Sequence, residues 1–422
     1  MNLLVLGGGG REHALVWKLR QSPRVTRIFA LPGSDAIAAL ATCLPGDPCD
    51  AAGVVAAAAA HAVDLVVVGP EAPLAAGVSD ALRAAGRAVF GPSRAAAQLE
   101  ASKTFAKLFM QRHRIPTARC VVVEDAAAAR RALTSFGLPV VLKADGLAAG
   151  KGVVIAASMA EAEAAAEDML SGKLVGEAGR RVVIEECLRG GEISVLALSD
   201  GERFQLLPPA RDHKRLLDGD RGPNTGGMGA ISCDALLPAA LAREVEDAII
   251  RPTLAGMAAE GAAFQGVLYC GLMLTGAGPR VLEYNARFGD PETQPILLRW
   301  QGDLAQTLHQ AALGRLEGVP APPLAPASAC VVAAAGGYPG AYARGARITG
   351  LSDAPGSETV VFHAGTRRRE GEWETTGGRV LGVAARAARL DRALADCYRA
   401  LARIHFDGMH FRTDIGAGGC HP

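Results

Sequence analysis

The first hundred residues alternate short runs rich in Val, Leu and Ile with Ala-rich stretches, and this alternation restricts the fold more than any other feature. Candidate strands are Leu3–Leu6, Arg27–Ala30, Asp64–Val68 and Ala88–Phe90, each followed closely by Gly or Pro. Strands that alternate with helices form parallel sheets, because each crossover helix returns the chain to the same edge of the sheet. Residues 1–101 are therefore predicted to form an α/β domain around a parallel sheet.

The rest of the chain divides into two further parts. A lysine-bearing helix is predicted at Ala101–Arg112, and a compact α/β segment follows it. In that segment and beyond it, strands are expected at 139–143, 152–155, 181–185, 267–274 and 280–284, and helices at 126–136 and 159–170. The Pro-rich stretch 318–326 is typical of a linker. Residues 328–422 are predicted to form a last domain, whose final helix carries apolar residues from Leu390 to Ile404.

Charge and cysteine usage restrict the partners and the compartment. The net charge is +1, and no long uncharged apolar run is present, so we expect neither a nucleic-acid nor a membrane partner. The nine cysteines form no Cys-x-x-Cys pair, and their odd number argues against a complete disulfide framework. A reducing cytoplasm is the expected setting. Cys420 and His421 are expected to lie in a frayed tail.

A first glycine cluster, residues 7–10, lies between a predicted strand and a predicted helix. Free backbone amides at such a turn favour an anion, so a phosphate could bind there. The cluster does not match a dinucleotide fingerprint, because the third glycine of G-x-G-x-x-G would fall at Glu12. The second strand also lacks a terminal acid and continues into Pro32 and Gly33. A nicotinamide cofactor is therefore not favoured.

A second glycine-rich loop, residues 143–152, starts at Lys143 and holds Lys151 between Gly150 and Gly152. It is not a Walker A loop, because its glycine spacing is too short and no Ser or Thr follows the lysine. The chain has seven lysines and 37 arginines, so lysines in a loop of small residues are unusual here. The pattern favours a phosphate clamp, with glycines that let the backbone approach and ammonium groups that neutralise charge. A flexible surface hairpin is the alternative.

Two further motifs follow, of which the first is weak when it is taken alone. Glu185 and Glu186 end a predicted strand and could bind ribose hydroxyls, although surface acids are the default interpretation. Asp212 and Lys214 precede the segment 222–229, in which four glycines, Pro and Asn predict a defined loop and neither helix nor strand. Long glycine-rich loops inside a compact domain are usually functional.

The last motif is an acid, an amide and a guanidinium at alternating positions. In an extended strand Glu283, Asn285 and Arg287 would share one face. Two oxygen ligands and a guanidinium suit a magnesium ion that bridges phosphates, with the arginine on a transferring phosphoryl group. The alternative is the polar solvent face of an edge strand.

Together these motifs resemble the ATP-grasp ligases, and more narrowly the phosphoribosylamine–glycine ligase (glycinamide ribonucleotide synthetase) family. The matching strings lie at 9–14, 68–74, 143–153, 222–230, 285–294, 336–340, 363–366, 377–381 and 414–416. The resemblance implies an α/β fold: a Rossmann-like domain at 1–101, an ATP-grasp domain at 102–320 with a small lid at about 116–189, and an α+β domain at 328–422. It implies ligation of glycine to 5-phospho-β-D-ribosylamine through a glycyl phosphate, giving glycinamide ribonucleotide, ADP and phosphate in purine biosynthesis. Mg²⁺ or Mn²⁺ would assist ATP, and the protein would be a monomer.

The resemblance also implies a role for individual residues. Arg287 and Lys143 would be catalytic, and Glu283 and Asn285 would bind the metal. The residues implied to bind ATP are Lys103, Lys143, Gly150, Lys151, Gly152, Glu185, Glu186, Cys187, Leu188 and Glu192. The residues implied to contact the other substrates are Gly9, Gly10, Glu71, Asp212, Lys214, Asn224, Thr225 and Asp290.

Four positions depart from the usual pattern of the family: Ser34, Arg211, Arg221 and Ile231. They affect the contacts expected from their loops and leave the expected activity in place. Three alternatives stay open at the level of the sequence. The chain could be another ATP-grasp carboxylate–amine ligase or carboxylase, a NAD-dependent oxidoreductase, or a nucleotide-binding protein without catalytic activity.

Overall fold

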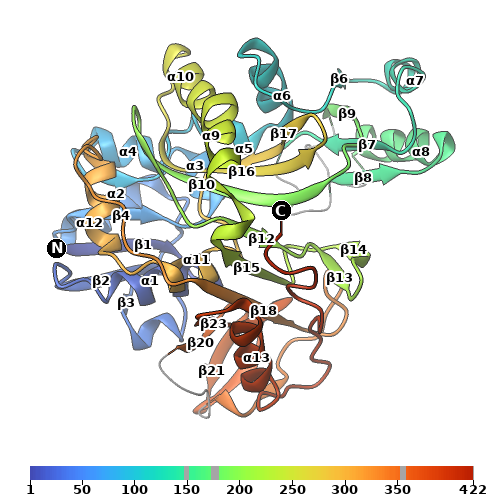
Figure 1. Cartoon of the computed structure of the whole chain (residues 1–422). Coiled ribbons are helices and arrows are strands. Elements are labelled where there is room, and N and C mark those ends of the chain that lie inside the picture. The colour runs from blue at the N-terminus through green and yellow to red at the C-terminus, as the bar shows by residue number, and fades with distance from the viewer. Residues whose placement is uncertain (147–151, 173–179, 352–357, 422) are drawn as a thin grey trace.

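The computed structural model describes residues 1–146, 152–172, 180–351 and 358–421 (Figure 1). A parallel sheet of five strands, in the order β3-β2-β1-β4-β5, forms its N-terminal part. The strands are β1 (Asn2–Gly7), β2 (Arg27–Pro32), β3 (Thr42–Cys43), β4 (Leu65–Val68) and β5 (Val89–Phe90). The helices around them are α1 (Gly10–Leu19), α2 (Ala51–Ala60), α3 (Glu71–Ala76) and α4 (Val78–Ala84), with a 3₁₀ turn at Ile37–Ala39. The predicted Rossmann-like sheet is confirmed, and the short strand β3 is an addition to it.

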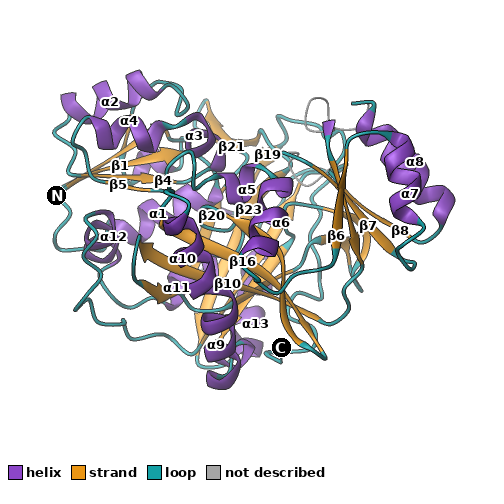
Figure 2. Ribbon diagram, turned by 90° about the horizontal axis from the view of Figure 1, so that it is seen from above, coloured by secondary structure: helices purple, strands orange, loops and turns teal. Residues whose placement is uncertain are grey.

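A second, smaller sheet lies to one side of the molecule, as Figure 2 shows. Its four antiparallel strands run in the order β6-β9-β7-β8. They are β6 (Cys120–Val123), β7 (Val140–Ala144), β8 (Val153–Ala156) and β9 (Val182–Glu186), and they are packed by α7 (Ala126–Leu133) and α8 (Met159–Leu170). Before them come α5 (Gln98–Ala101) and α6 (Lys103–Arg112), which connect this unit to the N-terminal sheet. The unit has its own apolar core, as expected for a lid.

The largest sheet joins the middle and the end of the chain. Eight strands run in the order β17-β16-β10-β12-β15-β18-β23-β20, and β11 pairs with β10. They are β10 (Gly191–Asp200), β11 (Phe204–Leu206), β12 (Ala210–Asp212), β15 (Gly229–Cys233), β16 (Gln265–Thr275), β17 (Gly278–Asn285), β18 (Ala327–Ala334), β20 (Thr359–His363) and β23 (Arg379–Ala387). Because β18 pairs with β15, the C-terminal strands extend the sheet that carries the central ones.

Helices and two small sheets complete the fold. The helices are α9 (Ala239–Val245), α10 (Arg251–Ala259), α11 (Thr293–Arg299), α12 (Leu304–Ala312) and α13 (Leu390–Leu401), with a 3₁₀ turn at Asp234–Leu236 and a π-helical turn at Glu246–Ile250. The small sheets pair β13 (Arg215–Leu217) with β14 (Arg221–Asn224), and β19 (Arg347–Ile348) and β21 (Thr366–Arg369) with β22 (Glu372–Thr375). In the described part of the chain, no helix combines the length and the apolar character needed to cross a membrane.

Three sequence-based expectations need correction. The segment 222–229 is not all loop, because its first residues belong to β14 and Gly229 begins β15. Ile404 is buried, yet it lies beyond the end of α13. The expectation that Cys420 lies in a frayed tail is wrong, since Cys420 forms a disulfide with Cys233 on β15.

Candidate functional site

The lid strand β7 carries a buried lysine, Lys143, one residue before its end. The ammonium of Lys143 donates to the carbonyl oxygen of Leu282 at 2.9 Å and lies 3.1 Å from the Glu185 carboxylate. Gly152 accepts from the amide of Ala144 at 2.8 Å and so closes the base of the glycine-rich loop. Gly150 and Lys151, which the sequence placed in the same phosphate clamp, lie outside the described residues.

Helix α6 brings a second lysine to this loop. Lys103 is the first residue of α6, and its ammonium donates to the carbonyl oxygen of Gly146 at 2.9 Å. Burial lowers the pKa of Lys103, while the nearby Glu283 acts to raise it. Lys103 from the helix and Lys143 from the lid therefore approach one region, since the charge of Lys143 also acts to lower the pKa of Lys103.

The predicted adenine segment, 185–188, begins with the last two residues of β9. The side chain of Glu185 is 2% exposed, and its Oε2 atom is 3.1 Å from both Lys107 and Lys143. The carboxylate of Glu186 accepts from the backbone amide of Arg119 at 2.8 Å, so it contributes to local structure. Cys187 and Leu188 continue from the strand toward β10.

Glu283 on β17 is the point at which cations from several elements converge. Burial alone would raise the pKa of this carboxyl group, but Lys214, Lys143 and Lys103 hold it below its usual range. Lys214 lies 3.6 Å from the Glu283 carboxylate and 3.3 Å from that of Glu192. Cations that surround one carboxylate in this way favour a polyanionic ligand with an associated metal ion.

The predicted metal pair occupies alternate positions on one strand. Glu283 pairs with Gly271, and Asn285 pairs with Tyr269, in the ladder between β17 and β16. Arg287 lies beyond the end of β17, so the prediction that all three residues lie on one strand is wrong for it. Its guanidinium is 2.9 Å from the Glu100 carboxylate and 3.3 Å from that of Glu71. Burial would lower the pKa of Arg287, but these two acids keep it raised.

Asp212 lies in the same charged region at the end of β12. Burial raises the pKa of Asp212 to about 7, Lys214 opposes that shift, and Glu292 adds to it. The charge of Asp212 in turn raises the pKa of Lys214 well above its usual value, although burial acts in the opposite direction. Thr225 is attached to this segment, because its backbone amide and its hydroxyl both donate to the carbonyl oxygen of Lys214, at 2.7 and 2.8 Å. Asn224 precedes it as the last residue of β14.

The first glycine cluster lies against a different group of predicted residues. A Cβ atom built on Gly10 would be 3.9 Å from the Asp290 carboxylate and 3.2 Å from the amide nitrogen of Gln294. Asp290 accepts from Gln294 at 2.8 Å and forms an ion pair with Arg379 at 2.8 Å. The backbone amide of Gly9 donates to Glu12, so one of the expected anion-binding amides is already paired within its own helix.

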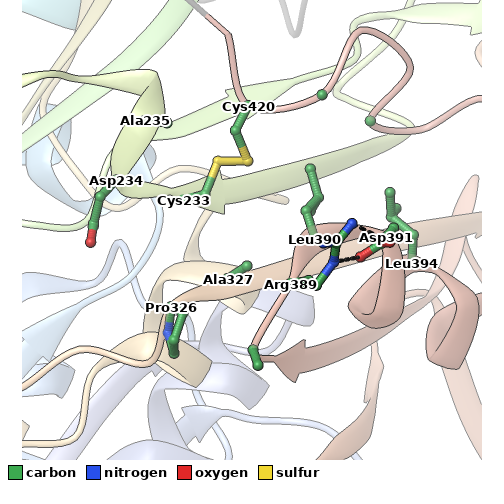
Figure 3. Close-up of a pocket in the computed structure, with 13 residues that line it drawn as sticks. Cys233, Asp234, Ala235, Pro326, Ala327, Arg389, Leu390, Asp391, Leu394 and Cys420 are labelled. Atoms are coloured by element: carbon green, nitrogen blue, oxygen red, sulfur yellow. Dashed lines mark hydrogen bonds and ion pairs between the residues drawn. A yellow bond between two sulfur atoms is a disulfide. The ribbon is translucent and has the colours of Figure 1, made fainter.

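Three functional candidates escaped the sequence reasoning: Lys107, Glu100 and Arg379. Lys107 follows Lys103 by one helical turn, so helical spacing together with the scarcity of lysine could have indicated it. Glu100 is far from Arg287 in sequence, and no local pattern marks it. Arg379 lies in the family-matching string 377–381, but its ion pair with Asp290 could not be predicted from that string. A separate pocket of about 480 Å³ lies under the C-terminal tail (Figure 3). It is lined by Cys233, Leu390 and Cys420 among others, and it includes none of the site residues described above.

Family models match almost the whole chain. The phosphoribosylglycinamide synthetase N domain matches residues 1–100, the ATP-grasp (A) domain matches 101–293 and the C domain matches 328–418. A phosphoribosylamine–glycine ligase of Caulobacter vibrioides is 51% identical over 418 residues, which cover 99% of this chain and 98% of that one. The chain belongs to the phosphoribosylglycinamide synthetase family. It is thus a member of the ATP-dependent ligases, as the sequence predicted.

Solved structures agree with this family. The phosphoribosylamine–glycine ligase of Thermotoga maritima is 34% identical, has a TM-score of 0.87, and the match covers 98% of this chain and 100% of that one. The biotin carboxylase domain of a Hydrogenobacter thermophilus 2-oxoglutarate carboxylase, solved with MgADP and bicarbonate, has a TM-score of 0.74. The latter match covers 97% of this chain and 91% of that one, and at 18% identity it shows a shared fold alone. The carboxylase and oxidoreductase alternatives are therefore not favoured.

Proposed function

We propose that this chain uses ATP to ligate glycine to 5-phospho-β-D-ribosylamine through a glycyl phosphate, releasing glycinamide ribonucleotide, ADP and phosphate. The observation that carries the proposal is the convergence on Glu283 of Lys103 from α6, Lys143 from the lid and Lys214 from the segment after β12. Such an arrangement fits ATP phosphates held between a lid and a sheet, in a chain of the phosphoribosylglycinamide synthetase family.

The nucleotide would lie between the lid and β17. Lys103 and Lys143 would bind the phosphates together with Gly150, Lys151 and Gly152. The segment from Glu185 to Leu188 would receive adenine, and Glu192 the ribose. The Glu185 carboxylate is already paired with lysines and the Glu186 carboxylate with the backbone amide of Arg119, which favours backbone contacts to the adenine. The assignment is supported by the position of this segment beside Lys143.

Glu283 and Asn285 fit a divalent cation. Mg²⁺ takes oxygen ligands and is often bound by one or two protein groups together with substrate phosphates and water. Within the described residues no group of three His, Cys, Asp or Glu side chains is arranged around a metal position, which agrees with a site that the nucleotide completes. A bound Mg²⁺ or Mn²⁺ would neutralise charge on the β- and γ-phosphates.

The reaction needs positioning and charge stabilisation more than acid–base chemistry. The glycine carboxylate would attack the γ-phosphorus, and the bond to the β,γ-bridging oxygen would break to release ADP. Arg287 would stabilise charge on the transferring phosphoryl group; its two acidic partners hold the guanidinium in one orientation. The amine of phosphoribosylamine would then attack the glycyl carbonyl carbon and displace phosphate.

The second substrate would lie between the first glycine cluster and the charged region. We assign Gly9, Gly10, Glu71 and Asp290 to one part of its site, and Asp212, Lys214, Asn224 and Thr225 to the other. The approach of Gly10 to Asp290 supports the first group, and the bonds of Thr225 to the Lys214 backbone support the second.

We also propose domain boundaries of 1–101, 102–320 with a lid at about 116–189, and 328–422; the ranges of the three family models support them. The protein would act as a monomer in the cytoplasm, without nucleic-acid or membrane partners. The balanced charge of the chain supports the absence of a nucleic-acid partner.

The deciding experiment measures ADP release with ATP, Mg²⁺ and glycine, while phosphoribosylamine forms in situ from ribose 5-phosphate and ammonia. We expect release to depend on both glycine and phosphoribosylamine. Release that ignores glycine, or that responds to bicarbonate instead, would contradict the proposal.

A further inference from the structure

Helix α6 carries two lysines one turn apart that point to different partners. Lys103 reaches the glycine-rich loop at Gly146, whereas Lys107 turns inward and is 2% exposed. The ammonium of Lys107 donates to the hydroxyl of Thr117 at 2.7 Å and lies 3.1 Å from the Oε2 atom of Glu185. No part of the proposed chemistry uses this buried charge.

Lys107 connects the lid to the strand that carries the proposed metal ligands. Glu185 is on β9, which pairs with β6 and β7 in the lid sheet. Thr117, the other partner, donates through its hydroxyl to the carbonyl oxygen of Val281 on β17 at 2.7 Å. The backbone of β17 is bound again at the same place, since the amide of Val281 donates to Pro116 at 2.8 Å.

The two carboxylate oxygens of Glu185 differ in their contacts. Its Oε2 atom is 3.1 Å from the ammonium of Lys107 and 3.1 Å from that of Lys143. Its Oε1 atom is buried and has no hydrogen-bond partner among the residues that the structure describes. A buried carboxylate oxygen without a partner destabilises the fold. The contacts of the other oxygen must therefore be strong enough to hold the side chain in this orientation.

The charges of this triad explain why two lysines are needed. A single Glu185–Lys143 pair would be neutral, and Lys143 would then offer little net charge to a phosphate. With Lys107 on the same oxygen, one negative charge faces two positive charges, and the triad keeps a net charge of about +1. Burial lowers the pKa of Lys107, and Glu185 opposes that shift and supports the charged form.

We propose that Lys107 is a positioning residue for nucleotide binding. It holds and neutralises Glu185, so that the charge of Lys143 stays available to the ATP phosphates and Oε1 of Glu185 stays fixed next to the nucleotide. This inference rests on the nucleotide site of the proposed function, and it is independent of which acid and which amine are joined.

A double-mutant cycle tests the inference by calorimetric titration with the non-hydrolysable ATP analogue AMP-PNP and Mg²⁺. Lys107→Met should weaken binding by about tenfold or more, because the buried Glu185 then pairs with Lys143 alone. In the Glu185→Gln background the same change should cost less than about threefold, since no charge is left for Lys107 to neutralise. Equal losses in both backgrounds would show that Lys107 acts through packing alone and would overturn the inference.

Two further variants keep the test decisive. Lys18→Met removes another largely buried lysine, on α1, and should leave AMP-PNP affinity unchanged. If Lys107→Met does not fold, Thr117→Val removes the second partner of Lys107 and should weaken AMP-PNP binding with Glu185 present but not with Gln at position 185. Wild-type affinity in the Thr117→Val variant would count against the inference. Because AMP-PNP binding needs neither glycine nor phosphoribosylamine, loss of the proposed ligase activity alone would leave this result interpretable.

Discussion

At the scale of single residues, the site is organised by carboxylates that each serve several cations. Glu283 is influenced by three lysines and by Arg287, which itself is held by Glu71 and Glu100. A buried charge is tolerated when opposite charges surround it, and removing one member leaves the others uncompensated. Single substitutions in this network are therefore expected to change metal and nucleotide binding together.

Glu283→Gln tests the proposed metal ligand. The amide keeps the shape of the side chain but loses the negative charge, so we expect the turnover rate to fall by at least about a hundredfold. Raising the concentration of Mg²⁺ or Mn²⁺ should restore part of the rate. ADP release measured across a metal titration checks this expectation. Glu244→Gln, on α9, serves as the control and should behave as wild type. Activity retained in Glu283→Gln at low metal concentration would refute the assignment.

At the scale of elements, the N-terminus of helix α6 is hydrogen-bonded to the lid. The hydroxyl of Ser102 accepts from the amide of Phe105 at 3.0 Å and donates to the Asp145 carboxylate at 2.9 Å. Asp145 also accepts from the amide of Thr104 at 3.1 Å. The N-cap of α6 therefore fixes Lys103, the next residue, relative to the loop that follows β7.

Ser102→Ala tests this connection. Loss of an N-cap costs about 1 kcal/mol of stability, and here it also removes the contact to Asp145. We expect the KM for ATP to rise severalfold while kcat changes less. The matched control is Asp125→Ala at the N-cap of α7, where the Asp125 carboxylate accepts from the amide of Ala128 at 2.7 Å. That variant should lose similar stability in urea unfolding and keep its KM, and equal changes of KM in both variants would contradict the idea.

The helices and strands that could be predicted from the sequence are those whose local residue pattern is enough to specify them. Strands β1 and β4 are continuous apolar runs, as buried parallel strands usually are, and α8 has the predicted bounds Met159–Leu170. Strand β14 was missed, because its residues Arg221–Asn224 include Gly and Pro and gain an extended form through pairing with β13. The partnership of Lys107 with Glu185 depends on how the lid packs against α6, and no local pattern contains that information.

At the scale of the whole molecule, the C-terminal end of the chain is attached to its central part. Arg211, which replaces the residue usual in the family, donates to the carbonyl oxygens of Gly419 at 2.7 Å and His421 at 3.0 Å. The Cys233–Cys420 disulfide closes 187 residues of sequence at the same place (Figure 3). The tail is thereby bound to β12, the strand that ends at the proposed substrate residue Asp212.

Cys420→Ser tests how much the disulfide stabilises the folded chain. Closing a loop of this length should stabilise the folded chain by about 2–4 kcal/mol under oxidising conditions. We expect the urea midpoint of Cys420→Ser to lie below that of wild type without reductant and to equal it with reductant, where Arg211 still holds the tail. Cys49→Ser, at a free cysteine, is the control. Identical midpoints for wild type and Cys420→Ser without reductant would contradict a stabilising disulfide.

Three buried histidines join distant parts of the molecule and make its stability depend on pH. Burial is the largest cause that lowers their pKa values, to about 3 for His13 and about 4 for both His213 and His363. His13 accepts from the backbone amide of His363 at 2.9 Å, and His213 accepts from that of Gly416 at 3.1 Å. These bonds need neutral rings, so protonation opposes contacts between the N-terminal, central and C-terminal segments.

The sign of the effect follows from proton linkage. Between pH 6.5 and about 4 the unfolded chain binds protons at these rings and the folded chain does not, so the free energy of unfolding falls as the pH falls. Each ring contributes a slope of up to about 1.4 kcal/mol per pH unit. Asp212, with a pKa raised to about 7 mainly by burial, opposes part of this slope.

His13→Asn keeps an acceptor for the backbone amide of His363. It should reduce the pH dependence of the free energy of unfolding by the contribution of one ring, measured by urea unfolding at pH 7.5, 6.0 and 5.0. His405→Asn, at an exposed ring, should retain the wild-type slope, and equal slopes for the two variants would exclude His13 from the effect.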